Sequence, residues 1–207
     1  MKMKTHLFIC SVLLGSTLLL SGCSKSNSTT NTPFQGPRNP SFETTSDWFV
    51  TYTASGGTYQ GGSFVDITTG TGFLPSNGIK YANMTTYNVF NPAPQASLYQ
   101  DSVYLNHSTT LSFDYQFTGT LGTYGGTATV QILFTSNGTT TLWTKTIDST
   151  SVLPVQKLGE TITLPATTVP GRLTITLNAL GGTDTHTTPT TITKTDIAFG
   201  IDNFTVK

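Results

Sequence analysis

Alternation of apolar and polar residues with a period of two is the feature that most restricts how this chain can fold. Residues 111–117 alternate strictly, and residues 127–134 and 173–179 follow the same pattern. Residues 197–206 also follow it, with one change of phase. This period places successive side chains on opposite faces of a β-strand. No apolar stripe of period 3.6 persists over a dozen residues. The sequence therefore predicts an all-β protein with almost no helix.

Turn signals separate these segments at short and even intervals. They occur at 55–57, 124–126, 137–138, 170–171 and 181–182. Asn137-Gly138 is typical of a hairpin turn. Further strands are predicted at 42–52, 62–68, 78–85, 96–105, 141–147 and 159–164. This spacing is typical of a two-sheet antiparallel β-sandwich, a jelly-roll, and residues 39–207 are predicted to form it as one domain.

The N-terminus has the pattern of a secretory signal. Lys2 and Lys4 precede an apolar run from Leu7 to Leu20, and a run of ~14 residues is shorter than the ~20 that span a bilayer. Residues 20–23, Leu-Ser-Gly-Cys, resemble a bacterial lipobox, which implies a signal peptide at 1–22 and acyl chains such as palmitate on Cys23. The alternative is an ordinary signal followed by an incidental cysteine.

Residues 23–38 are predicted to be the lipidated cysteine and a flexible tether, because they are polar, contain Pro and Gly, and lack periodicity. The other cysteine, Cys10, leaves with the signal, so the exported domain would have no disulfide. The predicted location is the bacterial cell envelope, as a membrane-anchored lipoprotein of the outer membrane or cell surface.

The charge pattern argues against nucleic acid as a partner. The chain has ten basic and ten acidic residues, and removal of Lys2 and Lys4 would leave eight basic against ten acidic, a net charge of −2. The basic residues are scattered and form no stripe of the kind that phosphate backbones require.

Five segments together resemble a known group of domains. They are 39–43 followed by Trp48, then 75–81, 96–100, 111–115 and 199–204. In this order they are similar to the galactose-binding-like β-sandwich modules, which include the carbohydrate-binding modules attached to many glycan-degrading enzymes. The resemblance covers nearly all of 39–207. It implies a non-catalytic module that binds a polysaccharide or glycoconjugate.

The last predicted strand contains a carboxylate, Asp202, in an otherwise apolar run. The apolar phase changes between Ile201 and Phe204, which predicts a β-bulge at Asp202 and Asn203. The resemblance implies a structural calcium that ties the first strand to the last, with Glu43 and Asp202 as the matching ligands, and a hard cation suits such oxygens. The alternatives are that Asp202 accepts backbone N–H groups at the bulge or faces solvent.

The resemblance also implies that glycans are bound on a sheet face or at loop tips. The predicted outward polar residues are Asp114, Gln116, Gln131 and Asn178, and the predicted loop aromatics are Tyr59, Tyr87, Tyr124 and Trp143. Aromatic rings would stack on sugars, and the polar groups would bond hydroxyls. The alternative for the aromatics is that they belong to the core.

The sequence gives little support to catalysis. It has only two glutamates, Glu43 and Glu160, and a glycosidase needs two carboxylates at a defined separation. No nucleophile elbow, phosphate loop or HExxH motif occurs. We therefore predict a binding module and not an enzyme. The alternatives are a structural or adhesive surface protein that contacts other proteins, and a glycan hydrolase with an unrecognised carboxylate site.

Overall fold

The computed structural model describes residues 35–52, 62–69, 73–90, 95–106 and 108–207. Residues 33–207 form one compact unit, and every strand lies within it. The predicted signal peptide, Cys23 and Tyr59 lie outside the described residues. Within the described part of the chain, no helix is long and apolar enough to cross a bilayer.

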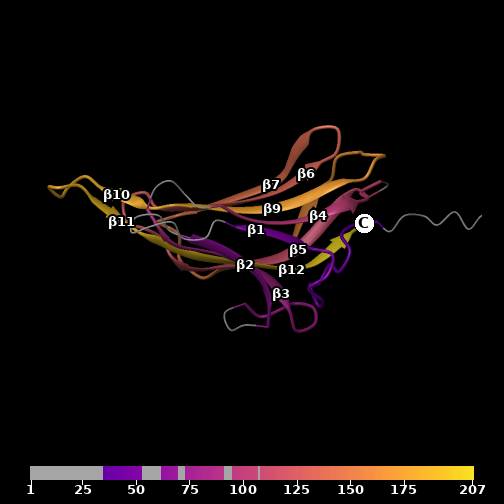
Figure 1. Ribbon diagram of the computed structural model, residues 1–207, viewed down its shortest axis with the longest axis horizontal. Helices are drawn as coiled ribbons and strands as arrows, with labels where there is room; N and C mark the ends of the chain where they lie inside the picture. Colours follow the sequence, from indigo (N-terminus) through magenta and orange to yellow (C-terminus); the bar gives the residue numbers. More distant parts are fainter. Residues whose placement is uncertain (1–34, 53–61, 70–72, 91–94, 107) are drawn as a thin grey trace, which may run out of the picture. The chain divides into compact units, whose positions relative to one another are not determined.

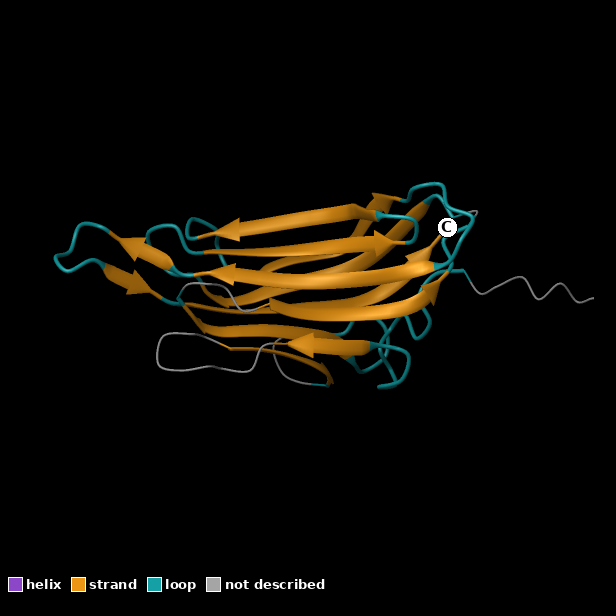
Figure 2. Ribbon diagram, turned by 45° about the horizontal axis from the view of Figure 1, so that its top comes forward, coloured by secondary structure: helices purple, strands orange, loops and turns teal. Residues whose placement is uncertain are grey.

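Two five-stranded antiparallel sheets form the two layers (Figures 1 and 2). The first has the order β1-β4-β9-β6-β7, the second has the order β2-β3-β12-β5-β8, and β10 and β11 form a separate hairpin that extends from one end. The prediction of an all-β, two-sheet sandwich is confirmed.

The strand bounds are as follows. The first sheet contains β1 (Phe49–Tyr52), β4 (Gln95–Val103), β9 (Gly171–Leu180), β6 (Thr127–Thr135) and β7 (Thr139–Asp148). The second contains β2 (Gly62–Thr68), β3 (Tyr81–Val89), β12 (Thr195–Val206), β5 (Thr110–Thr120) and β8 (Val155–Thr163). The hairpin is β10 (Gly182–Asp184) and β11 (Thr191–Thr193).

Alternation along the strands produces the core. The predicted inward residues of β6 (Ala128, Val130, Ile132, Phe134) and of β9 (Leu173, Ile175, Leu177, Ala179) are all buried. They face Phe113, Phe117 and Phe199 of the second sheet within one apolar cluster. The period of two thus correctly predicted which side of these strands is buried.

The first predicted strand, 42–52, is wrong in its first half, because β1 begins only at Phe49. Asn39, Phe42 and Asp47 have positive φ angles of 47°, 56° and 75°, which a regular strand does not allow. This segment instead buries Phe42 and Trp48 against Phe204. Gln100 holds the segment in place by accepting from the Arg38 N–H and donating to the Asp47 carbonyl.

The predicted bulge in the last strand and the predicted hairpin turn are both confirmed. The register of β12 against β5 shifts between Asp202 and Thr205, and Asn203 has a φ of 59°. Asn137 and Gly138 lie in the tight turn between β6 and β7. The bulge turns Phe204 back to the core, where it is buried.

Phe199→Ala is expected to lower the free energy of unfolding by about 3–5 kcal/mol, because it removes a fully buried ring from the central strand of the second sheet. Urea denaturation measures this change. Phe64→Ala, at a half-exposed ring on edge strand β2, is the matched control and should cost much less. Equal losses for the two variants would contradict this account of the core.

Candidate functional site

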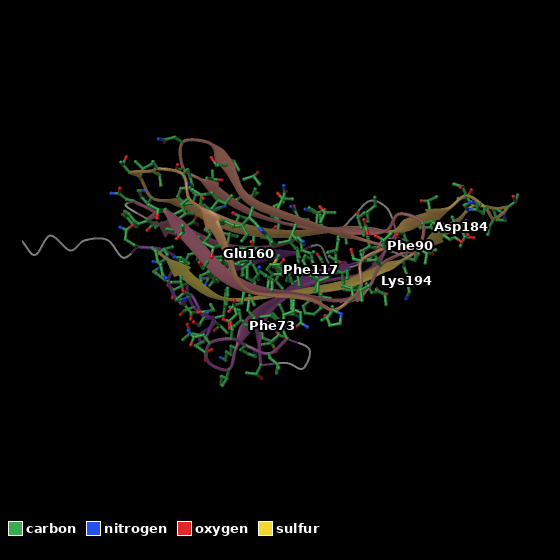
Figure 3. All side chains as sticks on the ribbon, turned by 180° about the vertical axis from the view of Figure 1, so that it is seen from behind. Phe73, Phe90, Phe117, Glu160, Asp184 and Lys194 are labelled. Carbon is green, nitrogen blue, oxygen red and sulfur yellow. The ribbon has the colours of Figure 1, made fainter. Side chains whose placement is uncertain are left out.

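The outer face of the first sheet carries three rows of side chains that face away from the core. The rows are Phe49, Tyr99, Thr174, Leu133 and Thr141; Thr51, Ser97, Thr176, Gln131 and Thr144; and Gln95, Asn178, Thr129 and Thr146. The sheet bends away from the other sheet toward the β6–β7 hairpin (Figures 1 and 3). We call this concave surface the outer face.

An aromatic pair lies at one edge of the outer face. The rings of Phe49 and Tyr99 stack with centroids 5.4 Å apart and planes 23° apart. Phe49 is 53% exposed, although large aromatic rings usually gain stability from burial. The pair therefore offers an open, flat apolar surface beside hydroxyl and amide groups.

A bidentate ion pair supports the aromatic pair. The guanidinium carbon of Arg172 lies 4.3 Å from the centroid of Tyr99. Arg172 donates from Nε and Nη2 to the two carboxylate oxygens of Asp101, at 2.7 and 3.1 Å. These bonds hold the pKa of Asp101 below its usual value. Because the two bonds to Asp101 restrict Arg172, its planar guanidinium is held over the Tyr99 ring.

Hydroxyl groups fill the centre of the outer face. Thr129 and Thr146 share a hydrogen bond of 2.9 Å. Thr176 is 4% exposed, and its buried Oγ1 has no hydrogen-bond partner. A buried hydroxyl without a partner is unusual. A molecule bound on the face cannot reach this buried oxygen, and the accessible polar groups at the centre are those of the partly exposed Ser97, Gln131 and Asn178.

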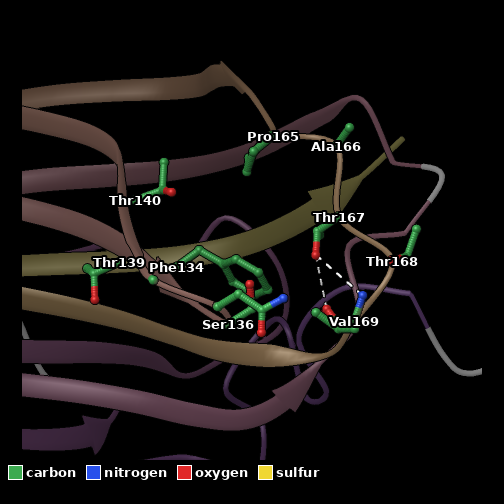
Figure 4. Close-up of a pocket in the computed structure, with 11 residues that line it drawn as sticks. Phe134, Ser136, Thr139, Thr140, Pro165, Ala166, Thr167, Thr168 and Val169 are labelled. Carbon is green, nitrogen blue, oxygen red and sulfur yellow. Dashed lines mark hydrogen bonds between the residues drawn. The ribbon is translucent and has the colours of Figure 1, made fainter.

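A hollow of about 380 Å³ lies beyond one end of the outer face (Figure 4). It is bounded by the β6–β7 turn and by residues 165–169, with Phe134 at its base. Thr139 lines the hollow and is opposite Thr135, which in turn is opposite Arg172. The hollow thus adjoins the end of the face where the ion pair lies.

The two predicted calcium ligands bind the same loop, residues 73–80. Oδ2 of Asp202 accepts hydrogen bonds from the Ser76 N–H at 2.8 Å and the Asn77 N–H at 3.0 Å. Oε1 of Glu43 accepts from the Ile79 N–H at 2.9 Å and the Lys80 N–H at 3.0 Å. Asp202 therefore holds the first half of this loop, and Glu43 holds the second half.

The surroundings of Asp202 fit a cation. Its Oδ1 is buried and has no hydrogen-bond partner, and burial raises the pKa of this carboxyl. Asp114 lies directly opposite it on β5, where like charges are unfavourable. No group of three or more acidic, His or Cys side chains is assembled within the described residues. Calcium bound here would therefore need backbone carbonyls or water in addition to these carboxylates.

The four predicted outward polar residues do not form one binding face, because they lie on two sheets. Gln131 and Asn178 are on the outer face of the first sheet, whereas Asp114 and Gln116 are on β5 of the second. Asp114 and Gln116 are also buried. Asp114 accepts hydrogen bonds from the Gly159 N–H and from Nδ2 of Asn203, so it links two irregular strand positions.

The predicted loop aromatics occupy three different environments. Trp143 is on β7 and packs 5.2 Å from both Phe113 and Tyr115, so its predicted place in a loop is wrong. Tyr87 is also on a strand, β3, opposite Gly62. Tyr124 is in a loop, half exposed and 5.6 Å from the ring of His186. None of these three lies in the rows of the outer face.

Sequence analysis missed the cluster of Phe49, Tyr99, Asp101 and Arg172. One signal for it was present: in residues 96–101 the apolar phase is Ala96 and Leu98, so Tyr99 is an aromatic residue on the polar phase. Its neighbours come from strands distant in sequence. Their approach depends on the order β1-β4-β9, which no local pattern contains.

Comparisons with known proteins support the fold. No protein-family model matches the chain, and no curated protein matches it. A solved structure that concerns the promiscuous specificity of carbohydrate-binding modules of the β-sandwich superfamily aligns with a TM-score of 0.50 and 16% identity, over 84% of this chain. This chain spans 63% of the length of that structure. At this identity the likeness shows the fold alone.

Two further solved carbohydrate-binding modules align at lower scores. One, in complex with β-1,4-galactotriose, gives a TM-score of 0.46 and 14% identity over 84% of this chain and 99% of its own. Another, a mannan-recognising module, gives a TM-score of 0.47 and 11% identity. That alignment covers 77% of this chain and 87% of the module. The β-sandwich architecture itself is shown by the two antiparallel sheets and by the alignment with a TM-score of 0.50.

Proposed function

We propose that this protein is a binding module that holds a polysaccharide on the outer face of its first sheet. The observation that carries the proposal is the exposed ring of Phe49, stacked on Tyr99 and supported by Arg172. A flat apolar surface beside a few fixed polar groups suits a sugar ring, which has apolar C–H faces and polar edges. Gln131, Asn178 and the threonine hydroxyls would bond the sugar hydroxyls.

The module is proposed to be non-catalytic. Glycoside hydrolysis uses two carboxylates that flank the scissile bond. The three rows of the outer face contain no carboxylate, and adjoining Asp101 is ion-paired with Arg172, which lowers its pKa. Such a carboxyl is a poor general acid at neutral pH. The geometry of this face thus favours binding over hydrolysis.

Phe49→Ala is expected to weaken polysaccharide binding about tenfold or more, because it removes the exposed stacking surface. Affinity electrophoresis against a panel of neutral polysaccharides measures the loss. Phe64→Ala, on β2 of the opposite sheet, is the matched control and should bind as the original protein does. Failure of the original protein to bind any polysaccharide, with recovery of crosslinked protein partners, would favour an adhesive role instead.

We also propose that calcium binds between the first and last segments of the domain, with Glu43 and Asp202 among its ligands. The support is the buried, unpartnered Oδ1 of Asp202. An ion there would neutralise a carboxylate that burial otherwise makes costly. Its role would be stability, because the site lies on the second sheet and away from the outer face.

Calcium at about 100 times its dissociation constant is expected to raise the melting temperature by about 5–10 °C. Thermal unfolding with calcium or with chelator measures this. Asp202→Asn should abolish the rise, whereas Asp148→Asn, which removes the same charge from an exposed turn, should retain it. A melting temperature that chelator leaves unchanged would exclude the site.

We propose that acyl chains on Cys23 anchor the domain in the bacterial envelope, on the outer membrane or cell surface. The support is the lipobox-like Leu-Ser-Gly-Cys at 20–23. Two or three chains hold a protein far more firmly than one. Metabolic labelling with palmitate should mark the original protein and not Cys23→Ala, whereas Cys10→Ala should still be labelled. Labelling of Cys23→Ala would contradict the proposal.

A further inference from the structure

The loop between β2 and β3 exposes two large aliphatic side chains. Leu74 is 81% exposed and Ile79 is 66% exposed. They lie in a loop whose Phe73 ring is buried against Gly200 and Tyr81. Because Phe73 fixes one end of the loop to the second sheet, the two aliphatic side chains are displayed on an anchored support and not on a free tip.

Four N–H groups and two side chains of this loop are hydrogen-bonded inside the protein. The N–H groups of Ser76 and Asn77 bond Asp202, and those of Ile79 and Lys80 bond Glu43. The side chains of Ser76 and Asn77 also donate, to Asp202 and to Ser41. Polar backbone groups without partners are what make loops costly in lipid. These groups would keep their hydrogen bonds when the loop enters a membrane interface.

The position of the loop points to the same partner. It contacts the segment through which the chain enters the domain, by the bond from Asn77 to Ser41 and by the Glu43 bonds. Eleven residues lie between Cys23 and Gln35 in the sequence, so the two are at most about 43 Å apart when the chain is extended. A lipid on Cys23 would therefore hold this loop within reach of the bilayer surface.

We infer that the loop 73–80 is a membrane-docking surface, with Leu74 and Ile79 inserted at the lipid interface. The inference rests on the proposed lipid anchor, which supplies a high local concentration of membrane. Phe73 covers Gly200 on the outward side of β12, so the loop lies on the sheet opposite the outer face. Docking through it leaves the proposed polysaccharide surface directed away from the membrane.

The test uses residues 33–207, the compact unit that contains every described strand. An N-terminal histidine tag holds this unit on phosphatidylcholine vesicles that carry a nickel-chelating lipid, so the result does not depend on Cys23. Because the chain has cysteines only at 10 and 23, Leu74→Cys or Val152→Cys provides a single site for an environment-sensitive fluorophore. Val152 is 86% exposed and lies in the β7–β8 loop at the other end of the sandwich.

The expected result is a blue shift of the emission at residue 74 on vesicle binding, with no shift at residue 152. No shift at 74, or equal shifts at both, would overturn the inference. The double variant Leu74→Ser/Ile79→Ser should also leave the vesicles about tenfold faster on addition of imidazole, whereas Val152→Ser should leave at the original rate. Equal rates for all three proteins would overturn it as well.

Acylation of Cys23 is measured separately, by the palmitate labelling described above. Labelling without a shift at residue 74 would overturn docking and keep the anchor. A shift at residue 74 without labelling would keep the membrane affinity of the loop and remove the proposed anchor. The melting temperatures of the serine variants should match that of the original protein, since both side chains are exposed.

Discussion

The hydrogen bonds that the buried Asp202 carboxylate accepts hold together the end of the sandwich where the first and last segments of the domain meet. Asp202 lies in β12, the central strand of the second sheet, where a bare charge would be costly. Its hydrogen bonds to Ser76 and Asn77 fix the loop before β3, and Glu43 fixes the other half of that loop. The N-terminal segment is thereby tied to the C-terminal strand without a disulfide.

The outward sides of the two sheets differ in which groups they leave accessible. On the second sheet, Phe73 covers Gly200, and the Asp114 carboxylate accepts hydrogen bonds from Gly159 and Asn203. On the first sheet, the outer face has an exposed ring at Phe49 and partly exposed amides at Gln131 and Asn178. The exposed aromatic ring and the accessible amides thus lie on the first sheet, which also holds the N-terminal segment through Gln100.

The features predicted from the sequence are those that depend on neighbouring residues. Alternation identified the inward faces of β6 and β9, and a phase change identified the bulge at Asn203. Whether an outward side chain is exposed depends instead on which segments, distant in sequence, lie against it. Asp114 and Gln131 occupy equivalent phases of their strands, yet only Asp114 is buried, where Gly159 of the adjacent strand β8 and Asn203 of β12 bond it. Strand order was the information that the sequence lacked.

The same reasoning explains why the candidate ligand surface consists of residues that are individually unremarkable in sequence. Phe49, Tyr99 and Arg172 come from three strands and acquire a common role only in the order β1-β4-β9. Arg172 is held by two bonds to Asp101, so few orientations are open to the guanidinium that lies over the Tyr99 ring. A surface that is already ordered loses less conformational entropy on binding. A rigid stack on a concave sheet can therefore bind a weakly interacting, flexible polymer more tightly than the same side chains on mobile loops would.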